Sequence, residues 1–225
     1  MASTPRFGSE GIAFLRALAA HNEREWFRER KEAYVRDVRG PMLAVVEQLS
    51  RDFRSLEPHL EATPQSIFRP YRDTRFSDDK TPLKTNIAAS FSWRGLGRTT
   101  GAGCYLSVSG TVVRVGGGLY LPGAPQLAAI RARIAEHPRT LRALLAAPRF
   151  VDTFGVLQGA QLQRVPRGYP SDHPAADLLR LKQFLAVVEW PAVVATDPDF
   201  YSRILAVYAA LLPLLRFLNA PLTGR

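Results

Sequence analysis

Apolar residues recur every three or four positions through the first quarter of the chain, which is the spacing of an amphipathic helix. The first predicted helix covers residues 9–20, with its apolar positions at Ile12, Phe14, Leu15, Leu18 and Ala19. Pro41 suits the first turn of a later helix, whose apolar face is formed by Met42, Val45, Val46, Leu49 and Phe53. This part of the chain is therefore predicted to be helical.

Another helix is predicted between these two segments. Asn22 and Glu25 have the spacing of a capping box, which marks a helix start, and Gly40 is expected to end the helix. Its aromatic side chains share one face, which is typical of core packing. We expect Phe27 in the core, whereas Tyr34 fits either the core or the wall of a pocket.

Strand patterns occupy the middle of the chain. Residues 105–110 and 111–115 are rich in β-forming residues and meet at Ser109-Gly110, which predicts a hairpin and hence an antiparallel sheet. Alternation also predicts a strand over residues 67–73, with Arg69 and Tyr71 on one face. Another strand should begin at Leu83 and extend through residues 86–93.

Helical patterns return in the second half, with one more strand among them. Helices are expected near residues 125–136, 141–147, 175–182 and 199–218, and a strand over residues 184–190. Because helices and strands are segregated along the chain, the predicted fold class is α+β, an antiparallel sheet with N-terminal and C-terminal helices packed on it. No linker or fixed-period repeat divides the sequence, so residues 1–225 are predicted to form a single domain.

The densest chemistry lies between Phe68 and Asn86, a run with five cations and three carboxylates. In one interpretation, the charges pair internally and stabilise a turn. In the other, the excess of cations binds an external anion, such as a phosphate or carboxylate. The predicted anion-binding residues are Arg69, Tyr71, Arg72, Arg75, Lys80, Lys84 and Arg167, and Asp73 and Asp79 are predicted to form a structural network.

This run, F-R-x-Y-R-D-T-R-F-S-x-D-K-x-P-x-K, resembles the signature of a bacterial and fungal domain-of-unknown-function family, number 2461. Further matches extend along most of the chain: Asn22-Glu23-Arg24-Glu25-Trp26-Phe27, Gly116-Gly117-Gly118 and Arg164-Val165-Pro166-Arg167-Gly168-Tyr169. The resemblance implies a single α+β domain and no assigned activity, substrate or cofactor. Leu83 departs from the family pattern, which usually has an aromatic residue there, so a direct ligand role for this side chain is not expected.

Charge and composition limit the choice of partners. The formal net charge is +10, but only four of the 30 basic residues are lysines and the arginines are spread along the chain. A dedicated nucleic-acid interface would instead have clustered cations with interleaved aromatic residues. We therefore expect no specific nucleic-acid partner, and only weak, salt-dependent association.

Metal and cofactor chemistry has little support in the sequence. Cys104 is the only cysteine, and the four histidines lack the paired spacing of a zinc site, so no metal and no cofactor are predicted. His173, beside Asp172, is a candidate proton carrier, but the favoured interpretation is that it caps or packs its loop. Gly116-Gly117-Gly118 indicates a close backbone approach rather than a phosphate loop.

No secretory signal or uncharged membrane span is recognised, so a cytoplasmic location without membrane partners is the expectation. The functional hypothesis is a binding domain with a basic pocket for an anionic or phosphorylated small molecule, formed by the central run and the loop from Arg164 to His173. One alternative is a non-catalytic interaction domain with an internal ionic network, and another is an enzyme acting on phosphoesters or nucleic acid. Whether the protein is an enzyme, and its oligomeric state, are left open.

Overall fold

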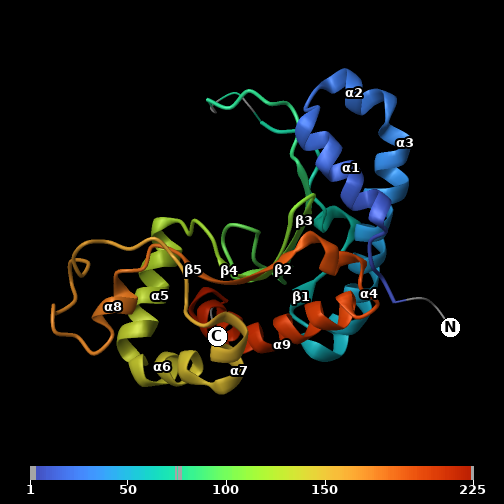
Figure 1. Ribbon diagram of the computed structural model, residues 1–225. Helices are drawn as coiled ribbons and strands as arrows, with labels where there is room; N and C mark the ends of the chain where they lie inside the picture. The colour runs from blue at the N-terminus through green and yellow to red at the C-terminus, as the bar shows by residue number, and fades with distance from the viewer. Residues whose placement is uncertain (1–3, 74, 76–77, 224–225) are drawn as a thin grey trace.

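The computed structural model describes residues 4–73, 75 and 78–223. Within them, the chain forms helices and a five-stranded antiparallel sheet, so the predicted α+β class is confirmed (Figure 1). The strands are β1 (Leu60–Glu61), β2 (Asn86–Trp93), β3 (Gly103–Ser109), β4 (Val112–Leu119) and β5 (Phe184–Pro191). The α-helices are α1 (Ser9–Ala20), α2 (Arg24–Glu29), α3 (Lys31–Ala33), α4 (Gly40–Leu56), α5 (Ala124–Glu136), α6 (Pro138–Ala146), α7 (Pro148–Phe154), α8 (Ala176–Leu179) and α9 (Phe200–Asn219).

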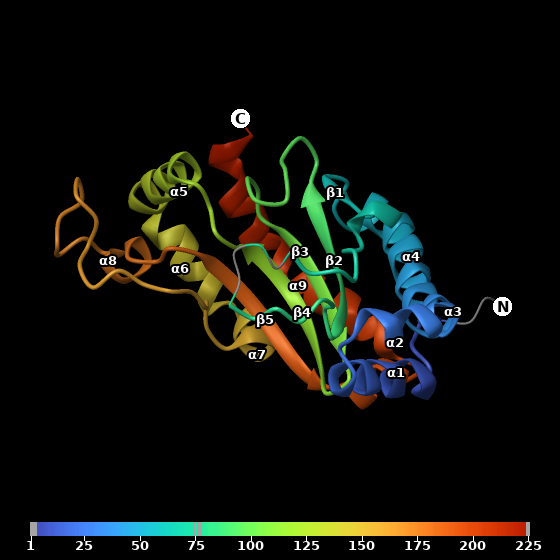
Figure 2. The ribbon, with the colours of Figure 1, turned by 90° about the horizontal axis from the view of Figure 1, so that it is seen from above.

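The sheet has the strand order β1-β2-β3-β4-β5, and every neighbouring pair is antiparallel. Long helix α9 lies under one face and packs on β4, as the view from above shows (Figure 2). That face supplies alternate side chains to the core, such as Ile87, Ala89 and Phe91 of β2. Over the opposite face, no helix of the described residues lies in either view (Figures 1 and 2). This uncovered face is the surface beside which the candidate site lies.

Glycines allow β4 to lie very close to its neighbours. A Cβ atom on Gly117 would lie 2.1 Å from the carbonyl oxygen of Gly103 and 2.9 Å from a methyl group of Leu211 in α9. Gly118 has φ +123°, a conformation that residues with a side chain rarely adopt. The glycine run is therefore a place of close backbone approach, as the sequence predicted.

The N-terminal helices differ from the prediction in their boundaries. Gly40 does not end a helix: it has α-helical φ and ψ angles and begins α4 directly after the π-helix η1 (Tyr34–Arg39). Asn22 does not cap α2, whose N-cap is Glu23 without a side-chain bond. Helix α7 and the short strand β1 were not predicted, because both are too short to show a clear period.

Short helices complete the chain, and α9 closes the core. The 3-10 helices are η2 (Pro64–Ser66), η3 (Ala192–Thr196) and η4 (Ala220–Leu222). The segment Phe200–Leu222 is long and apolar enough to cross a membrane by length and composition alone. Here, however, its side chains are largely buried against the sheet, which is the ordinary arrangement of a core helix.

Candidate functional site

The described residues 70–73, 75 and 78–84 belong to an irregular hairpin, and we call these residues the arm. Its two sides pair through a bridge between Tyr71 and Leu83 and through backbone bonds from Arg72 to Pro82 and from Lys84 to Pro70. Before the arm, Ile67 pairs with Ala89 of β2, so the predicted strand over residues 67–73 is present only as isolated bridges. The arm then leaves the sheet and overhangs its uncovered face (Figures 1 and 2).

Two contacts attach the arm to the N-terminal helices. The side-chain amide of Asn22 donates to the Leu83 carbonyl oxygen at 2.9 Å, and its oxygen accepts from the Leu83 N–H at 3.0 Å. The Tyr71 ring packs edge-on against Phe27 of α2, with centroids 6.0 Å apart. Leu83 itself is fully buried, which agrees with the expectation that its side chain contacts no ligand.

The outer part of the arm contains internal ion pairs. Arg75 makes two bonds to the Asp73 carboxylate, at 3.0 and 2.8 Å, and Arg72 pairs with Asp79. The Arg75 guanidinium lowers the pKa of Asp73, and hydrogen bonds from Thr81 lower the pKa of Asp79. Because these groups are largely exposed, the pairs define the shape of the arm more than they stabilise the fold.

At the base of the arm, in contrast to its outer part, basic side chains lie together without carboxylate partners among the described residues. The Lys84 Nζ atom lies 5.1 Å from the centre of the Phe68 ring, and the Arg98 Cζ atom lies 4.8 Å from it. Lys84 Nζ also donates to the Arg69 carbonyl oxygen at 3.1 Å, and Arg98 donates to the carbonyl oxygen of Gln65. Among the described residues, no carboxylate oxygen lies within 4 Å of the charged nitrogens of Arg69, Lys84 or Arg98. We call Arg69, Lys84 and Arg98 the cation cluster.

The electrostatics of Lys84 follow from this arrangement. Burial lowers its pKa below the ordinary value of 10.5, and the positive charges of Arg69 and Arg98 lower it further. Phe68 faces the uncovered side of the sheet, because it lies opposite Ala88 in the register set by the Ile67–Ala89 bridge. Lys84 and Arg98 therefore lie at the edge of that uncovered face, without a carboxylate partner among the described residues, whereas the charge of Arg69 also acts on Asp73 and lowers its pKa.

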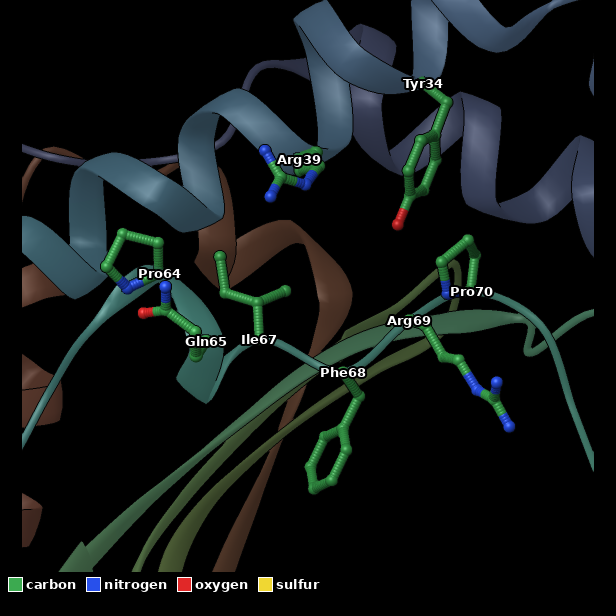
Figure 3. Close-up of a pocket in the computed structure, with 8 residues that line it drawn as sticks. All are labelled: Tyr34, Arg39, Pro64, Gln65, Ile67, Phe68, Arg69 and Pro70. Carbon is green, nitrogen blue, oxygen red and sulfur yellow. The ribbon is translucent and has the colours of Figure 1, made fainter.

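On the other side of the same segment is a cavity of about 380 Å³. Figure 3 shows the Tyr34 hydroxyl directed from η1 towards Pro70, with Arg39 and Ile67 in the same space. Tyr34 and Arg39 are five residues apart, which is the spacing of the i→i+5 hydrogen bonds of a π-helix, and a π-turn of this kind frequently marks a functional site. Burial raises the pKa of Tyr34 to about 12, so its hydroxyl stays protonated and can donate a hydrogen bond.

The loop between α7 and α8, which contains Arg167 and His173, lies elsewhere. Gln158, at its start, pairs with Leu185 of β5, so the loop leaves the sheet at the edge opposite to the base of the arm (Figures 1 and 2). His173 Nδ1 accepts the Ala175 N–H at 3.0 Å, which is a loop-capping contact. Arg167 is exposed on this loop, apart from the cation cluster.

Several site residues were not identifiable from the sequence. Arg98 lies in a glycine-rich turn between β2 and β3, 14 residues after Lys84, and nothing in its local pattern indicates that it reaches Phe68. Tyr34 was recognised as a residue of either core or pocket, but Arg39 was not. No group of three or more His, Cys, Asp or Glu that could hold a metal ion occurs in the part of the chain that the structure describes.

The comparisons agree with the resemblance of the central run. A family model described as "Conserved hypothetical protein (DUF2461)" matches residues 10–217, so the chain belongs to this family. No curated protein and no solved structure matches the chain. The family description assigns no activity, and any function must therefore be inferred from the geometry of the site.

Proposed function

We propose that this member of the DUF2461 family binds a small anionic or phosphorylated molecule at the cation cluster. The observation behind the proposal is the convergence of Lys84 and Arg98 at Phe68, with Arg69 near enough for its charge to lower the pKa of Lys84. Among the described residues, none of the three has a carboxylate oxygen within 4 Å of its charged nitrogens. Three like charges held together repel one another, and an anion placed between them relieves that repulsion. Burial is the larger cause of the lowered pKa of Lys84, and repulsion from Arg69 and Arg98 lowers it further.

A phosphate or carboxylate suits these side chains chemically. Guanidinium groups offer paired N–H donors that match two oxygens of such an anion, and an ammonium group adds a compact charge. No helix of the described residues covers the face of the sheet beside Phe68 (Figure 2). The arm, attached through Asn22 and Tyr71, would hold the base of the site in place.

The alternative of an internal ionic network is favoured for the outer arm alone. There, Arg72 and Arg75 already have carboxylate partners in Asp79 and Asp73. These two arginines are therefore assigned to the structure of the arm, and the proposed ligand contacts are restricted to the cation cluster.

Substitution of the cation cluster tests the proposal. Lys84→Met and Arg98→Met should each weaken binding of inorganic pyrophosphate by about 10- to 150-fold, because each removes a charge-assisted hydrogen bond of about 1.5–3 kcal/mol. Isothermal titration calorimetry measures the affinity. Arg28→Met is the matched control: it removes the same charge, but from an exposed pair with Glu25. Equal losses in all three variants would show that only net charge matters and would contradict a defined site.

The pH dependence of binding gives a second test. The anion binds the charged form of Lys84, so affinity should be complete below the lowered pKa and decrease as pH rises through it, before 10.5 is reached. Pyrophosphate also loses its last proton in this alkaline range, but it does so with either protein, so the difference between the native protein and Lys84→Arg reports on Lys84 alone. Lys84→Arg should abolish the decrease, because a guanidinium remains charged throughout this range. A decrease of the same size in Lys84→Arg would exclude Lys84 as its source.

A further inference from the structure

A second cavity, of about 450 Å³, lies where the end of α9 meets the turn between β2 and β3. Its walls combine polar and apolar side chains, among them His59, Arg94, Leu96, Arg216 and Leu222. This cavity is separate from the one beside Tyr34. Its size falls within the range of small-molecule sites.

A buried carboxylate organises the polar side of this cavity. The Glu57 side chain is only 3% exposed, and it bonds to His59 Nδ1 at 2.8 Å and to Arg216 Nε at 2.7 Å. Burial alone would raise the pKa of Glu57, but the hydrogen bonds from His59 and Arg216 outweigh it and the pKa is lowered. Glu57 is therefore a permanent negative charge that contacts both a histidine and an arginine.

His59 is held in one orientation by three contacts. Besides the bond to Glu57, its ring stacks on Trp93 with centroids 5.1 Å apart and planes within 3°, and its carbonyl oxygen accepts the Arg94 N–H at 2.6 Å. Because Nδ1 faces a carboxylate, that nitrogen holds the ring proton, and Nε2 is the nitrogen that gains or loses a proton. The His59 side chain is 47% exposed, so a molecule in the cavity can reach it.

Both arginines of the cavity keep donors for a ligand. Arg216 uses Nε for Glu57, and Arg94 uses Nε for Glu61 at 3.1 Å. In both, the terminal guanidinium nitrogens make no hydrogen bond to the described residues. A guanidinium has five N–H donors, so each arginine can bind an anion without leaving its carboxylate.

The charges around His59 balance when its imidazole is neutral. Glu57 at the end of α4 and Glu61 of β1 offset Arg94 after β2 and Arg216 of α9. Cys104 of β3, which lies near Glu57, adds no charge, because burial raises the pKa of its thiol well above the ordinary value. Protonation of His59 leaves one net positive charge facing the cavity, which a single negative charge would neutralise.

We propose that this cavity binds a small carboxylic acid as its monoanion, and that His59 takes up one proton at Nε2 when the anion binds. Arg94 and Arg216 bind the carboxylate, and the apolar part of the ligand contacts Leu96 and Leu222. The inference goes beyond the anion site at the cation cluster, because it concerns a different cavity and couples binding to protonation of an imidazole that the cluster lacks.

Benzoate is a suitable probe, and benzamide is its uncharged counterpart. The imidazole resonances of His59 are followed by NMR from about pH 5 to 9, with and without benzoate. If the protonated form binds benzoate tenfold more tightly, the titration midpoint rises by about one pH unit. Benzamide should leave the midpoint unchanged. Absence of a midpoint shift with benzoate at millimolar concentration, or an equal shift with benzamide, would overturn the proposal.

Substitutions of the cavity residues test whether benzoate binds beside His59 and Arg94. His59→Gln keeps a donor to Glu57 but has no titrating nitrogen, so benzoate affinity should fall by about tenfold at pH 6 and become independent of pH. Arg94→Met should weaken benzoate binding by a similar factor. Arg203→Met, which removes an arginine paired with Asp199, is the control and should have no effect on benzoate affinity.

Lys84→Met should also leave benzoate binding intact, so the proposals for the two sites can be confirmed or refuted independently. Unchanged binding in both His59→Gln and Arg94→Met would refute the assignment.

Discussion

Gly118→Ala is expected to destabilise the protein by about 2–6 kcal/mol, a large part of the stability of about 5–15 kcal/mol that is typical of a folded domain. The new Cβ atom would lie 1.9 Å from the carbonyl oxygen of Phe184 in β5. Relief requires movement of β4, which is paired on both sides, so overpacking should cost about 1–3 kcal/mol. The positive φ of Gly118 adds strain of about 1–3 kcal/mol. Urea unfolding followed by circular dichroism measures the loss.

Gly168→Ala is the matched control for this substitution. Gly168 also has a positive φ, +93°, but no heavy atom lies within 4 Å of the position that its Cβ would occupy. The control should therefore show the backbone strain without the clash, a loss of about 1–3 kcal/mol. If Gly118→Ala were no more destabilising than Gly168→Ala, close packing of β4 against β5 would not be the reason for glycine at position 118.

Asn219→Ala should be the second strongly destabilising change, at about 2–6 kcal/mol. The Asn219 side chain is buried at the end of α9, where its oxygen accepts the Ala102 N–H at 2.8 Å and its amide donates to the Ala102 carbonyl oxygen at 2.9 Å. Truncation leaves two buried backbone groups without partners, at about 1–3 kcal/mol each. The same unfolding measurement reports the effect.

Asn22 makes the same pair of bonds to Leu83, but in a partly exposed position, and it is the natural comparison. Water can replace the lost partners there, so Asn22→Ala should cost only about 1 kcal/mol. Its main effect should be on the arm, seen as faster amide exchange at Leu83. Equal losses at positions 22 and 219 would mean that burial does not determine the contribution of these bonds.

Elements with a clear local period were predictable from the sequence. The helix over residues 9–20, the hairpin turn at Ser109-Gly110 and the last helix agree closely with α1, β3–β4 and α9. In each of these elements, the spacing of apolar side chains follows the face that is buried. The sequence pattern therefore indicates both the type of element and its buried face. The membership of the family was likewise predictable, because the central run is long and its residues are adjacent.

Helix boundaries predicted from the local sequence were wrong where contacts with residues distant in the chain determine the structure. Asn22 has the sequence context of a helix cap, but its amide pairs with Leu83, 61 residues later. Gly40 has the context of a helix end, but packing of α1 on η1, where Gly11 lies against the Asp37 carbonyl oxygen, accompanies a continuous turn into α4. Such contacts depend on which elements the fold brings together.

The charges of the central run show which ion pairs can be predicted from the sequence and which cannot. The amino-acid order alone shows that the run is polar and includes both acids and bases. The pairs that form within it, Asp73 with Arg75 and Asp79 with Arg72, join residues no more than seven positions apart. Which cations pair with a distant carboxylate, and which have none among the described residues, depends on the packing of distant segments: Glu57 meets Arg216 across 159 residues, whereas Arg98 reaches Phe68 from a separate turn. Short-range pairing follows from chain connectivity, whereas the location of unneutralised charge depends on how distant segments pack.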